Sequence, residues 1–340
     1  MSRSLCIILN NTLLLMLLNI VWLLVGLILI LVGANALTDG ASSLARRMGV
    51  SDLIIGLTVV AFGTSAPELA ISVISAANGE AQLAIGNVVG SNIFNILVII
   101  GITALVKPIV IERTVLSLEI PMVILSSVIL LVLGNSSWLN GGGMNEVSRV
   151  SGIFLLIFFL MFMRYTFASA RRTPGATAAD VNSPADTKSL PTWRACISVV
   201  AGLAALVFGG DKFVDGASGI AASMGVSQAV IGLTIVAAGT SLPELATSIV
   251  AATKGRSAMA IGNVIGSNIF NVLMVLGLSA TVRPLPFGTI GNLDLLTLLG
   301  ASILFLIFGW IIKERTITRA EGGILTACYI AYIAALLSRL

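Results

Sequence analysis

The sequence has no histidine, three cysteines and few charged residues. The absence of histidine removes the commonest metal ligand and the side chain that normally titrates near neutral pH. Cys6, Cys196 and Cys328 lie too far apart to make a recognisable metal motif or disulfide framework. Charged residues form 10% of the chain, whereas a soluble domain has about 25%. With 57% hydrophobic residues and a mean hydropathy of +1.07, the chain is predicted to be an integral membrane protein.

Apolar runs long enough to cross a bilayer recur along the 340 residues. They predict an all-α integral membrane fold of ten transmembrane helices, near residues 13–45, 53–77, 81–105, 117–134, 148–168, 194–222, 228–252, 257–281, 294–312 and 321–338. The first run could instead belong to a cleaved signal peptide, because Ala34 and Ala36 form an A-x-A pair. We favour a membrane helix, since the apolar region of a signal peptide has only about 7–15 residues.

A polar segment rich in proline, alanine, serine and threonine separates the fifth helix from the sixth. We interpret this segment, residues 168–193, as a linker between two five-helix halves, residues 1–167 and 194–340. Basic residues concentrate on the cytoplasmic side of membrane proteins. With the N-terminus outside, 14 of the 19 basic residues fall inside. The pattern predicts a multi-pass protein of the cell (inner or plasma) membrane, with both termini outside and a cytoplasmic linker.

The two halves contain an internal repeat. A shift of 176 residues places residues 56–108 on residues 232–284 without a gap, with 31 identities in 53 positions. Because each half has an odd number of helices, the two repeats are expected to have opposite orientations in the membrane. Gene duplication retained for packing would preserve apolar and small residues, but Glu, Asn, Thr and Ser recur as well. We therefore expect a binding site near the bilayer midplane, where the halves meet.

Two acidic residues occupy matching positions in this repeat. Glu68 lies near the middle of the second predicted helix and Glu244 near the middle of the seventh. Burying a carboxylate at this depth costs at least about 2.5–3.5 kcal/mol. The second, third, seventh and eighth helices contain no Lys or Arg to pair with them. The acids are either protonated and hydrogen-bonded, or they bind a cation, and we favour the cation.

A proline precedes each acid. Pro67 and Pro243 cannot donate a backbone hydrogen bond to the carbonyls of Gly63 and Gly239, so each helix is expected to loosen there. A simple proline kink is the alternative. Freed carbonyls, hydroxyls and carboxylates are the oxygen ligands that hard cations such as Ca²⁺ and Na⁺ take. Asp39 and Asp215, where the first and sixth helices carry small residues, are more typical of helix capping or solvation and rank below the glutamates as candidate ligands.

The second duplicated motif is G-N-V-V-G-S-N-I-F-N at residues 86–95, matched by G-N-V-I-G-S-N-I-F-N at residues 262–271. Ser91 and Asn95 are four residues apart and share one helix face, as do their counterparts in the second half. Each pair offers a hydroxyl and an amide oxygen to one point. The remaining asparagines are expected to make hydrogen bonds between helices: Asn87, Asn92, Asn263 and Asn268.

The duplicated G-T-S-x-P-E and G-N-x-x-G-S-N-I-x-N motifs resemble the α-repeats of the cation/calcium exchanger superfamily, in particular compact prokaryotic-type sodium/calcium exchangers. The resemblance covers essentially the whole chain. It implies a diamond of the second, third, seventh and eighth helices around a central ion site. The first and sixth helices would slide beside it to expose the site to alternate sides. The linker is too short for the calcium-sensing domains of larger animal exchangers.

Carried onto this sequence residue by residue, the resemblance implies a ligand set of two carboxylates, six hydroxyls, two backbone carbonyls and amide oxygens. These residues are Glu68, Glu244, Thr64, Ser65, Thr240, Ser241, Ser91, Ser267, Ala61, Ala237, Asn95 and Asn271. One departure concerns Asn271, because sodium/calcium members often carry Asp there. Two carboxylates still neutralise one Ca²⁺.

The expected function is exchange of Ca²⁺ for Na⁺ by alternating access, without a cofactor or enzymatic activity. The expected partners are the lipid bilayer and these ions, with no nucleic acid. Exchange of H⁺ for Ca²⁺ or another divalent cation is an alternative, because protons could replace sodium at buried glutamates. A cation channel with a proline-broken selectivity region is a second alternative. An intramembrane protease is a third, but Thr64 and Ser65 have no plausible base except Glu68.

Overall fold

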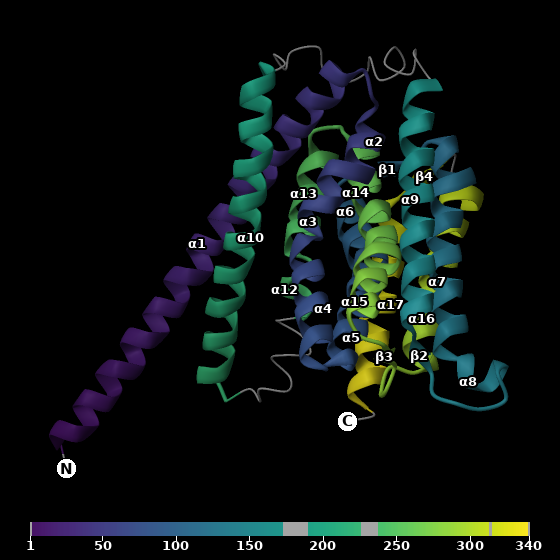
Figure 1. Cartoon of the computed structure of the whole chain (residues 1–340). Coiled ribbons are helices and arrows are strands. Elements are labelled where there is room, and N and C mark those ends of the chain that lie inside the picture. The colour runs from purple at the N-terminus through teal and green to yellow at the C-terminus, as the bar shows by residue number, and fades with distance from the viewer. Residues whose placement is uncertain (1, 173–189, 226–236, 313–314, 339–340) are drawn as a thin grey trace.

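The computed structural model describes residues 2–172, 190–225, 237–312 and 315–338 (Figure 1). Apart from four two-residue strands, the described residues form helices and their connections. Strand β1 pairs antiparallel with β4, and β2 pairs antiparallel with β3. The structure thus confirms the all-helical class that the apolar runs predicted.

The first half contains helices with both α and π geometry, the latter labelled η. Its elements are α1 (Ser2–Met48), α2 (Asp52–Ile55), η1 (Gly56–Val60), α3 (Ala61–Thr64), α4 (Ala66–Asn78), α5 (Ala81–Phe94), η2 (Asn95–Ile99), α6 (Ile100–Val106), β1 (Ile109–Val110), η3 (Val115–Glu119), α7 (Ile120–Gly134), α8 (Ser136–Leu139), β2 (Glu146–Val147) and α9 (Arg149–Arg172).

The second half follows the same plan. Its described elements are α10 (Thr192–Ser223), α12 (Ala237–Gly239), α13 (Leu242–Thr253), α14 (Ser257–Ile269), η7 (Phe270–Val275), α15 (Leu276–Val282), β3 (Leu285–Pro286), α16 (Asn292–Ile307), η8 (Phe308–Ile312), β4 (Thr316–Ile317) and α17 (Arg319–Leu337). Most of the predicted linker and the start of the predicted helix 228–252 lie outside the described residues.

Seven described helices are long and apolar enough to cross a membrane. An eighth span results if residues 52–64 and 66–78, which bend by 47° at Ser65, are counted as one. The predicted helix at 53–77 is therefore present but broken, close to Gly63, where it was expected to loosen. Pro67 in the first turn of α4 explains the break, since it has no N–H for the preceding turn.

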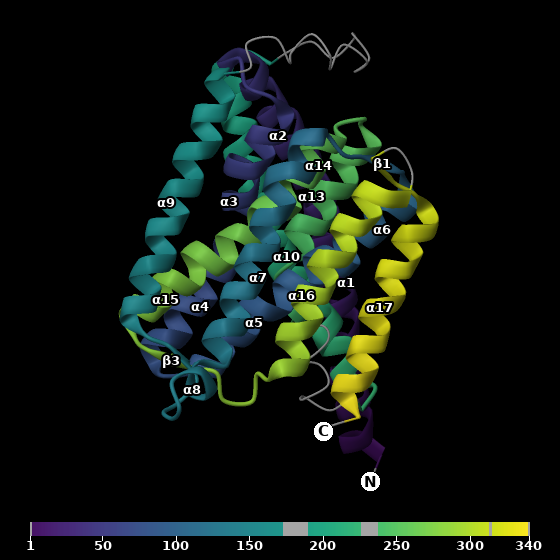
Figure 2. The ribbon, with the colours of Figure 1, turned by 90° about the vertical axis from the view of Figure 1, so that its right-hand side faces the viewer.

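Opposite ends of the molecule carry corresponding turns of the two halves. The turn between α4 and α5 lies at the lower end in Figure 1, and the turn between α13 and α14 lies at the upper end. Helix α1 begins and α17 ends at the lower end, whereas α9 ends and α10 begins at the upper end (Figures 1 and 2).

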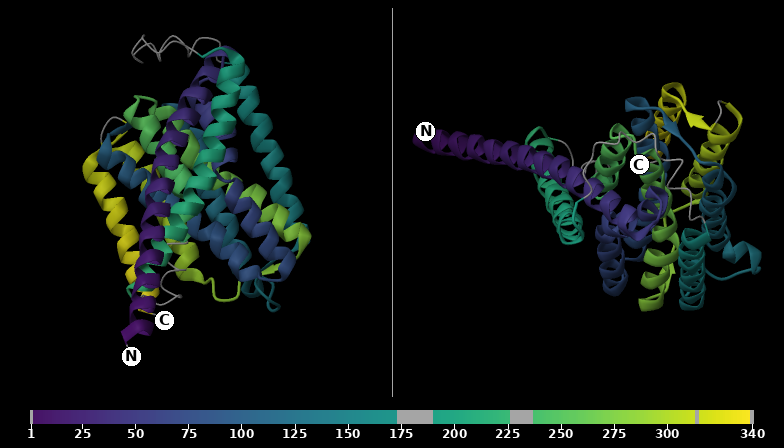
Figure 3. Two further views of the ribbon diagram at one scale, coloured as in Figure 1. Left: turned by 90° about the vertical axis from the view of Figure 1, so that its left-hand side faces the viewer. Right: turned by 90° about the horizontal axis from the view of Figure 1, so that it is seen from above.

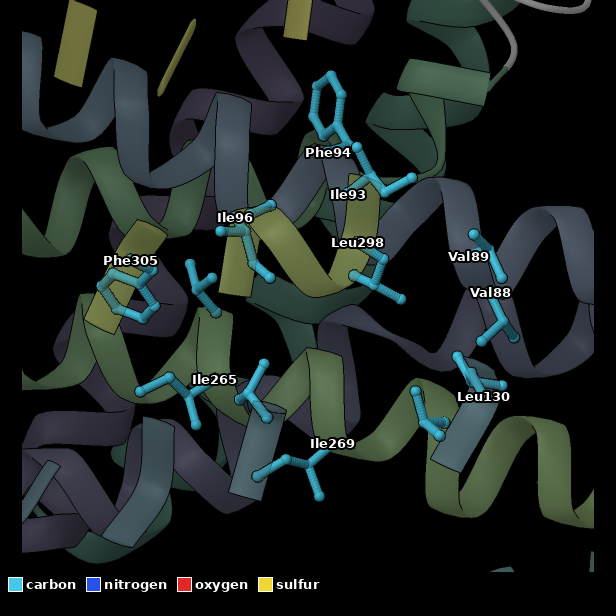
Figure 4. Close-up of a cluster of buried hydrophobic side chains, with 14 of the residues drawn as sticks. Val88, Val89, Ile93, Phe94, Ile96, Leu130, Ile265, Ile269, Leu298 and Phe305 are labelled. Carbon is cyan, nitrogen blue, oxygen red and sulfur yellow. The ribbon is translucent and has the colours of Figure 1, made fainter. Parts of the chain in front are cut away.

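The inner layer consists of the two helices that carry the second motif. In the most apolar 18-residue stretches of the spans 81–106 and 257–282, 83% and 94% of the residues are buried, respectively. A helix buried on every side has no polar face to give an amphipathic pattern, which explains their nearly continuous apolar sequence. Figure 4 shows side chains of α5 and α14 packing with Leu130 of α7 and with Leu298 and Phe305 of α16.

Helices α1 and α10 form a separate antiparallel pair at one side of this body (Figures 1 and 3). A glycine occurs every seventh residue on each facing side: Gly26, Gly33 and Gly40 on α1, and Gly202, Gly209 and Gly216 on α10. At Gly33, an added Cβ would lie 2.8 Å from the carbonyl oxygen of Gly202 and 2.9 Å from the nitrogen of Leu206. Because these are backbone atoms, only glycine permits the helices to approach so closely.

Ion pairs attach the upper end of α1 to the turn between α13 and α14. The carboxylate of Asp39 lies 2.9 Å from Lys254 Nζ and 3.1 Å from Arg256 Nη1. Arg256 is buried and also donates to the carbonyl of Thr38 at 2.8 Å. Asp39, whose side chain is 45% exposed, therefore joins α1 to another helical segment in addition to contacting solvent. Its counterpart Asp215 pairs within α10, with Lys212 at 2.8 Å.

Replacing Gly33 with alanine should lower the thermal unfolding midpoint of the purified protein, because the two helices must separate or distort. Overpacking of this kind costs about 1–3 kcal/mol. Gly300→Ala is the matched control, since Gly300 also lies within a helix and a Cβ added there would meet no neighbour within 4 Å. Thermal unfolding in detergent measures both variants. Equal midpoints for the two would contradict the close-packing interpretation.

Candidate ion site

Each acidic residue lies in the first turn of a helix, directly after a break. Ser65 lies between α3 and α4 with φ −85° and ψ 7°, and Ser241 precedes α13 with φ −94° and ψ 7°. Glu68 and Glu244 therefore lie in the first turns of α4 and α13, where unpaired backbone N–H groups favour negative charge. The prolines place the carboxylates at helix N-termini in the protein interior.

The two halves complete each other's site through crossed hydrogen bonds. Ser65 Oγ donates to Glu244 Oε1 at 3.1 Å, and Ser241 Oγ donates to Glu68 Oε1 at 3.5 Å. Both glutamates are 1% exposed. Within the described residues, neither carboxylate pairs with a basic side chain. The acids, which are 176 residues apart in sequence, thus face a common interior region.

Two asparagines hold the broken helices in the same way in both halves. Asn87 Nδ2 donates to the Glu68 carbonyl at 3.3 Å and to Ser72 Oγ at 3.0 Å. The corresponding bonds from Asn263 to the Glu244 carbonyl and Ser248 Oγ have the same two lengths. These bonds agree with the predicted interhelical role of the two asparagines. Neither serine was among the predicted site residues, although the two coincide under the same 176-residue shift.

Some hydroxyl and carbonyl groups of the first broken helix already form hydrogen bonds within the protein. Thr64 Oγ1 donates to Asn263 Oδ1 at 3.2 Å and lies 3.4 Å from the carbonyl of Ala61. That carbonyl also accepts from the Ser65 nitrogen at 3.0 Å. In the second half the Ser241 nitrogen instead donates to Ala238 at 3.2 Å. Ala237 begins α12, and Thr240 is half-buried in the turn before α13.

The second motif places four more predicted residues in the interior, each at most 3% exposed: Ser91, Asn95, Ser267 and Asn271. Asn95 begins the π-helical turn η2, and Asn271 is the second residue of η7. Such turns widen the helix locally and are frequent at functional sites. Asn92, whose predicted role was interhelical, donates to the Asn268 carbonyl at 3.2 Å. Asn268 differs, because its side chain donates to Val264 of its own helix.

Several oxygen atoms of the predicted ligands have no hydrogen-bond partner among the described residues. They are Glu68 Oε2, Glu244 Oε2, Asn95 Oδ1, Asn271 Oδ1 and Ser267 Oγ. Leaving a buried polar group unsatisfied costs about 1–3 kcal/mol, so five at one set of residues require an explanation. Carboxylate, amide and hydroxyl oxygens are the donors that Ca²⁺ and Na⁺ prefer. The donor set therefore fits a hard cation.

Comparison with known proteins agrees with this chemistry. The family model described as sodium/calcium exchanger protein matches residues 18–168 and 195–338. The chain belongs to the sodium/calcium exchanger family. This exchanger is therefore a membrane antiporter involved in ion transport, not an enzyme.

Full-length relatives occur in both bacteria and archaea. The exchanger is 36% identical to the inner membrane protein YrbG of Escherichia coli over 94% of this chain and 97% of that protein. It is 32% identical to the sodium/calcium exchanger MaX1 of Methanosarcina acetivorans, over 94% of this chain and 98% of that protein. The solved sodium-calcium exchanger NCX_Mj superposes with a TM-score of 0.79 at 32% identity, covering 94% of this chain and 98% of its own.

Ser65→Ala and Ser241→Ala should each raise the KM for Ca²⁺ about three- to tenfold, because each removes a hydroxyl that fixes the opposite carboxylate. Ca²⁺ uptake by proteoliposomes measures this change. Ser302→Ala is the control, since Ser302 is also buried and bonded to a serine, Ser127, on another helix. An unchanged KM in both site variants would show that the crossed bonds do not shape the site.

Proposed function

We propose that this antiporter exchanges Ca²⁺ for Na⁺ at one shared site, with Glu68 and Glu244 as the charged ligands. The observation that supports this proposal best is the set of buried oxygens with no hydrogen-bond partner among the described residues, which includes one oxygen from each glutamate. The remaining proposed ligands supply neutral oxygens: Thr64, Ser65, Thr240, Ser241, Ser91, Ser267, Ala61, Ala237, Asn95 and Asn271. Ca²⁺ and Na⁺ would compete for these atoms, so one ion must leave before the other enters.

Burial of the site supports an alternating-access mechanism rather than a continuous pore. Both glutamates are 1% exposed, so ions reach them only after helices move. The pair α1–α10 lies beside the body that carries the site (Figure 3), and we propose that it moves over this body as a unit. An empty site with two uncompensated carboxylates is costly to enclose, which couples closure to ion binding and makes the exchange obligatory.

The topology that we propose for this function has ten transmembrane helices in two inverted five-helix repeats. Residues 1–167 form the first half, residues 168–193 a cytoplasmic linker, and residues 194–340 the second half. The corresponding turns at opposite ends of the molecule support the inversion (Figure 1). The excess of basic residues on the linker side supports a cytoplasmic linker and termini outside.

Proteoliposomes loaded with Na⁺ and diluted into Na⁺-free buffer should take up Ca²⁺, and Glu68→Gln and Glu244→Gln should each abolish the uptake. Each substitution removes one of the two charges that balance Ca²⁺. Glu80→Gln is the control, because Glu80 is an exposed carboxylate at the start of α5. Normal flux in both site variants would refute the assignment of the site. Uptake driven only by a pH gradient would identify H⁺ as the counter-ion.

The rate of this uptake should not depend on membrane potential. Asn271 is neutral, so the two glutamates give the site a formal charge of −2, which one Ca²⁺ or two monovalent cations balance. The potential is set with valinomycin and a K⁺ gradient, at values of opposite sign. A rate that follows the potential would show that a different number of monovalent ions moves per Ca²⁺.

A further inference from the structure

A chain of hydrogen bonds crosses between the halves at the second motif. Asn92 Nδ2, from α5, donates to the backbone carbonyl of Asn268 in α14 at 3.2 Å. Asn271 Nδ2, from η7, donates to Asn92 Oδ1 at 3.0 Å. All three residues are at most 1% exposed, so water does not compete for these bonds.

This chain fixes the orientation of both side-chain amides. The Asn268 carbonyl can only accept a hydrogen bond, so Asn92 must direct its NH₂ group toward it. The oxygen of Asn92 then faces Asn271, which must present its own NH₂ group in return. Asn271 Oδ1 is consequently turned away from Asn92, and it has no partner among the described residues.

We propose that Asn92 is a positioning residue. It directs the side-chain oxygen Oδ1 of Asn271 toward the ion, and it requires the residue at position 271 to be neutral. An aspartate at 271 would place a carboxylate, which cannot donate, against the oxygen of Asn92. Asn92 could turn its NH₂ group to meet that carboxylate only by giving up the bond to Asn268. Two facing acceptors without water are unfavourable. The proposal rests on the proposed function, because it treats Asn271 as a ligand.

The repeat supplies an internal control for this arrangement. Under the 176-residue shift, the counterpart of the pair Asn92–Asn271 is the pair Asn268–Asn95. Asn268 Nδ2 donates to Val264 of its own helix, and Asn268 Oδ1 has no partner among the described residues. It therefore accepts nothing from Asn95. Of the two amides Asn95 and Asn271, only that of Asn271 has a hydrogen bond to the opposite repeat among the described residues.

Two double-mutant cycles on Ca²⁺ uptake by the full chain in proteoliposomes test this inference. The first uses Asn92→Ala and Asn271→Ala, and the second uses Asn268→Ala and Asn95→Ala. Asn92→Ala should raise the KM for Ca²⁺ about three- to tenfold when Asn271 is present. It should change the KM less than about twofold when Asn271 is already alanine. The maximal rate should change little. In the second cycle, Asn268→Ala should change the KM by the same factor whether or not Asn95 is already alanine.

A third measurement determines the effect of Asn271→Asp on the KM for Ca²⁺. Adding a carboxylate to a cation site normally raises its affinity, but Asn271→Asp should raise the KM for Ca²⁺ because the new acceptor faces Asn92. Adding Asn92→Ala to this variant should lower the KM again. A purely structural role of Asn92 predicts the opposite, since a second interior change would further weaken the protein. Asn92→Leu, which keeps the branching at Cγ but cannot form hydrogen bonds, replaces Asn92→Ala if the alanine variant is not monodisperse after purification.

The outcomes separate this inference from the proposed function. No Ca²⁺ uptake by the wild-type protein would overturn both. Normal wild-type uptake with independent effects of Asn92→Ala and Asn271→Ala would overturn only the positioning role. A lower KM in Asn271→Asp would overturn the requirement for a neutral residue. Two results together would establish the inference. They are coupling in the first cycle but not in the second, and a lower KM for Ca²⁺ when Asn92→Ala is added to Asn271→Asp.

Discussion

Two buried carboxylates that pair with no basic side chain in the described part of the chain are the constraint on which the rest of the structure depends. Glu68 and Glu244 are each 1% exposed, and one oxygen of each has no partner among the described residues. A folded protein tolerates such groups only if something compensates their charge or their missing hydrogen bonds. Here hydroxyls from the opposite half bind one oxygen of each carboxylate, and the other oxygens remain available to a cation.

The backbone of the inner helices is shaped to present these oxygens. Breaks at Ser65 and Ser241 place both acids at helix N-termini, and the π turns η2 and η7 carry the two amides. Asn87 and Asn263 then hold each broken helix to its neighbour by bonds of equal length. Regular α-helices would satisfy their own backbone groups and would offer the interior far fewer polar atoms.

The inner helices and the outer pair differ in how they pack. The inner helices are enclosed by apolar side chains (Figure 4), whereas α1 and α10 meet each other through glycines. Asp39 joins α1 to a Lys-Gly-Arg turn at one end, but the corresponding turn of the first repeat reads Asn-Gly-Glu. The two halves are therefore alike in how Asn87 and Asn263 hold the broken helices, and unlike at the ends of the outer pair.

The sequence by itself determined the membrane class, the helical segments, the repeat and the two central acids, because burial in lipid restricts polar residues to functional positions. The full set of candidate ligands came from the resemblance of the duplicated motifs to a known family. It indicated a weakness at Pro67 but not a complete break, since neighbouring helices decide whether a loosened turn opens. Only the tertiary structure decided the crossed serine–glutamate bonds, the ion pairs of Asp39 and the tie between Asn92 and Asn271. These contacts join residues more than 170 positions apart, and their existence depends on how the two halves pack rather than on any local pattern.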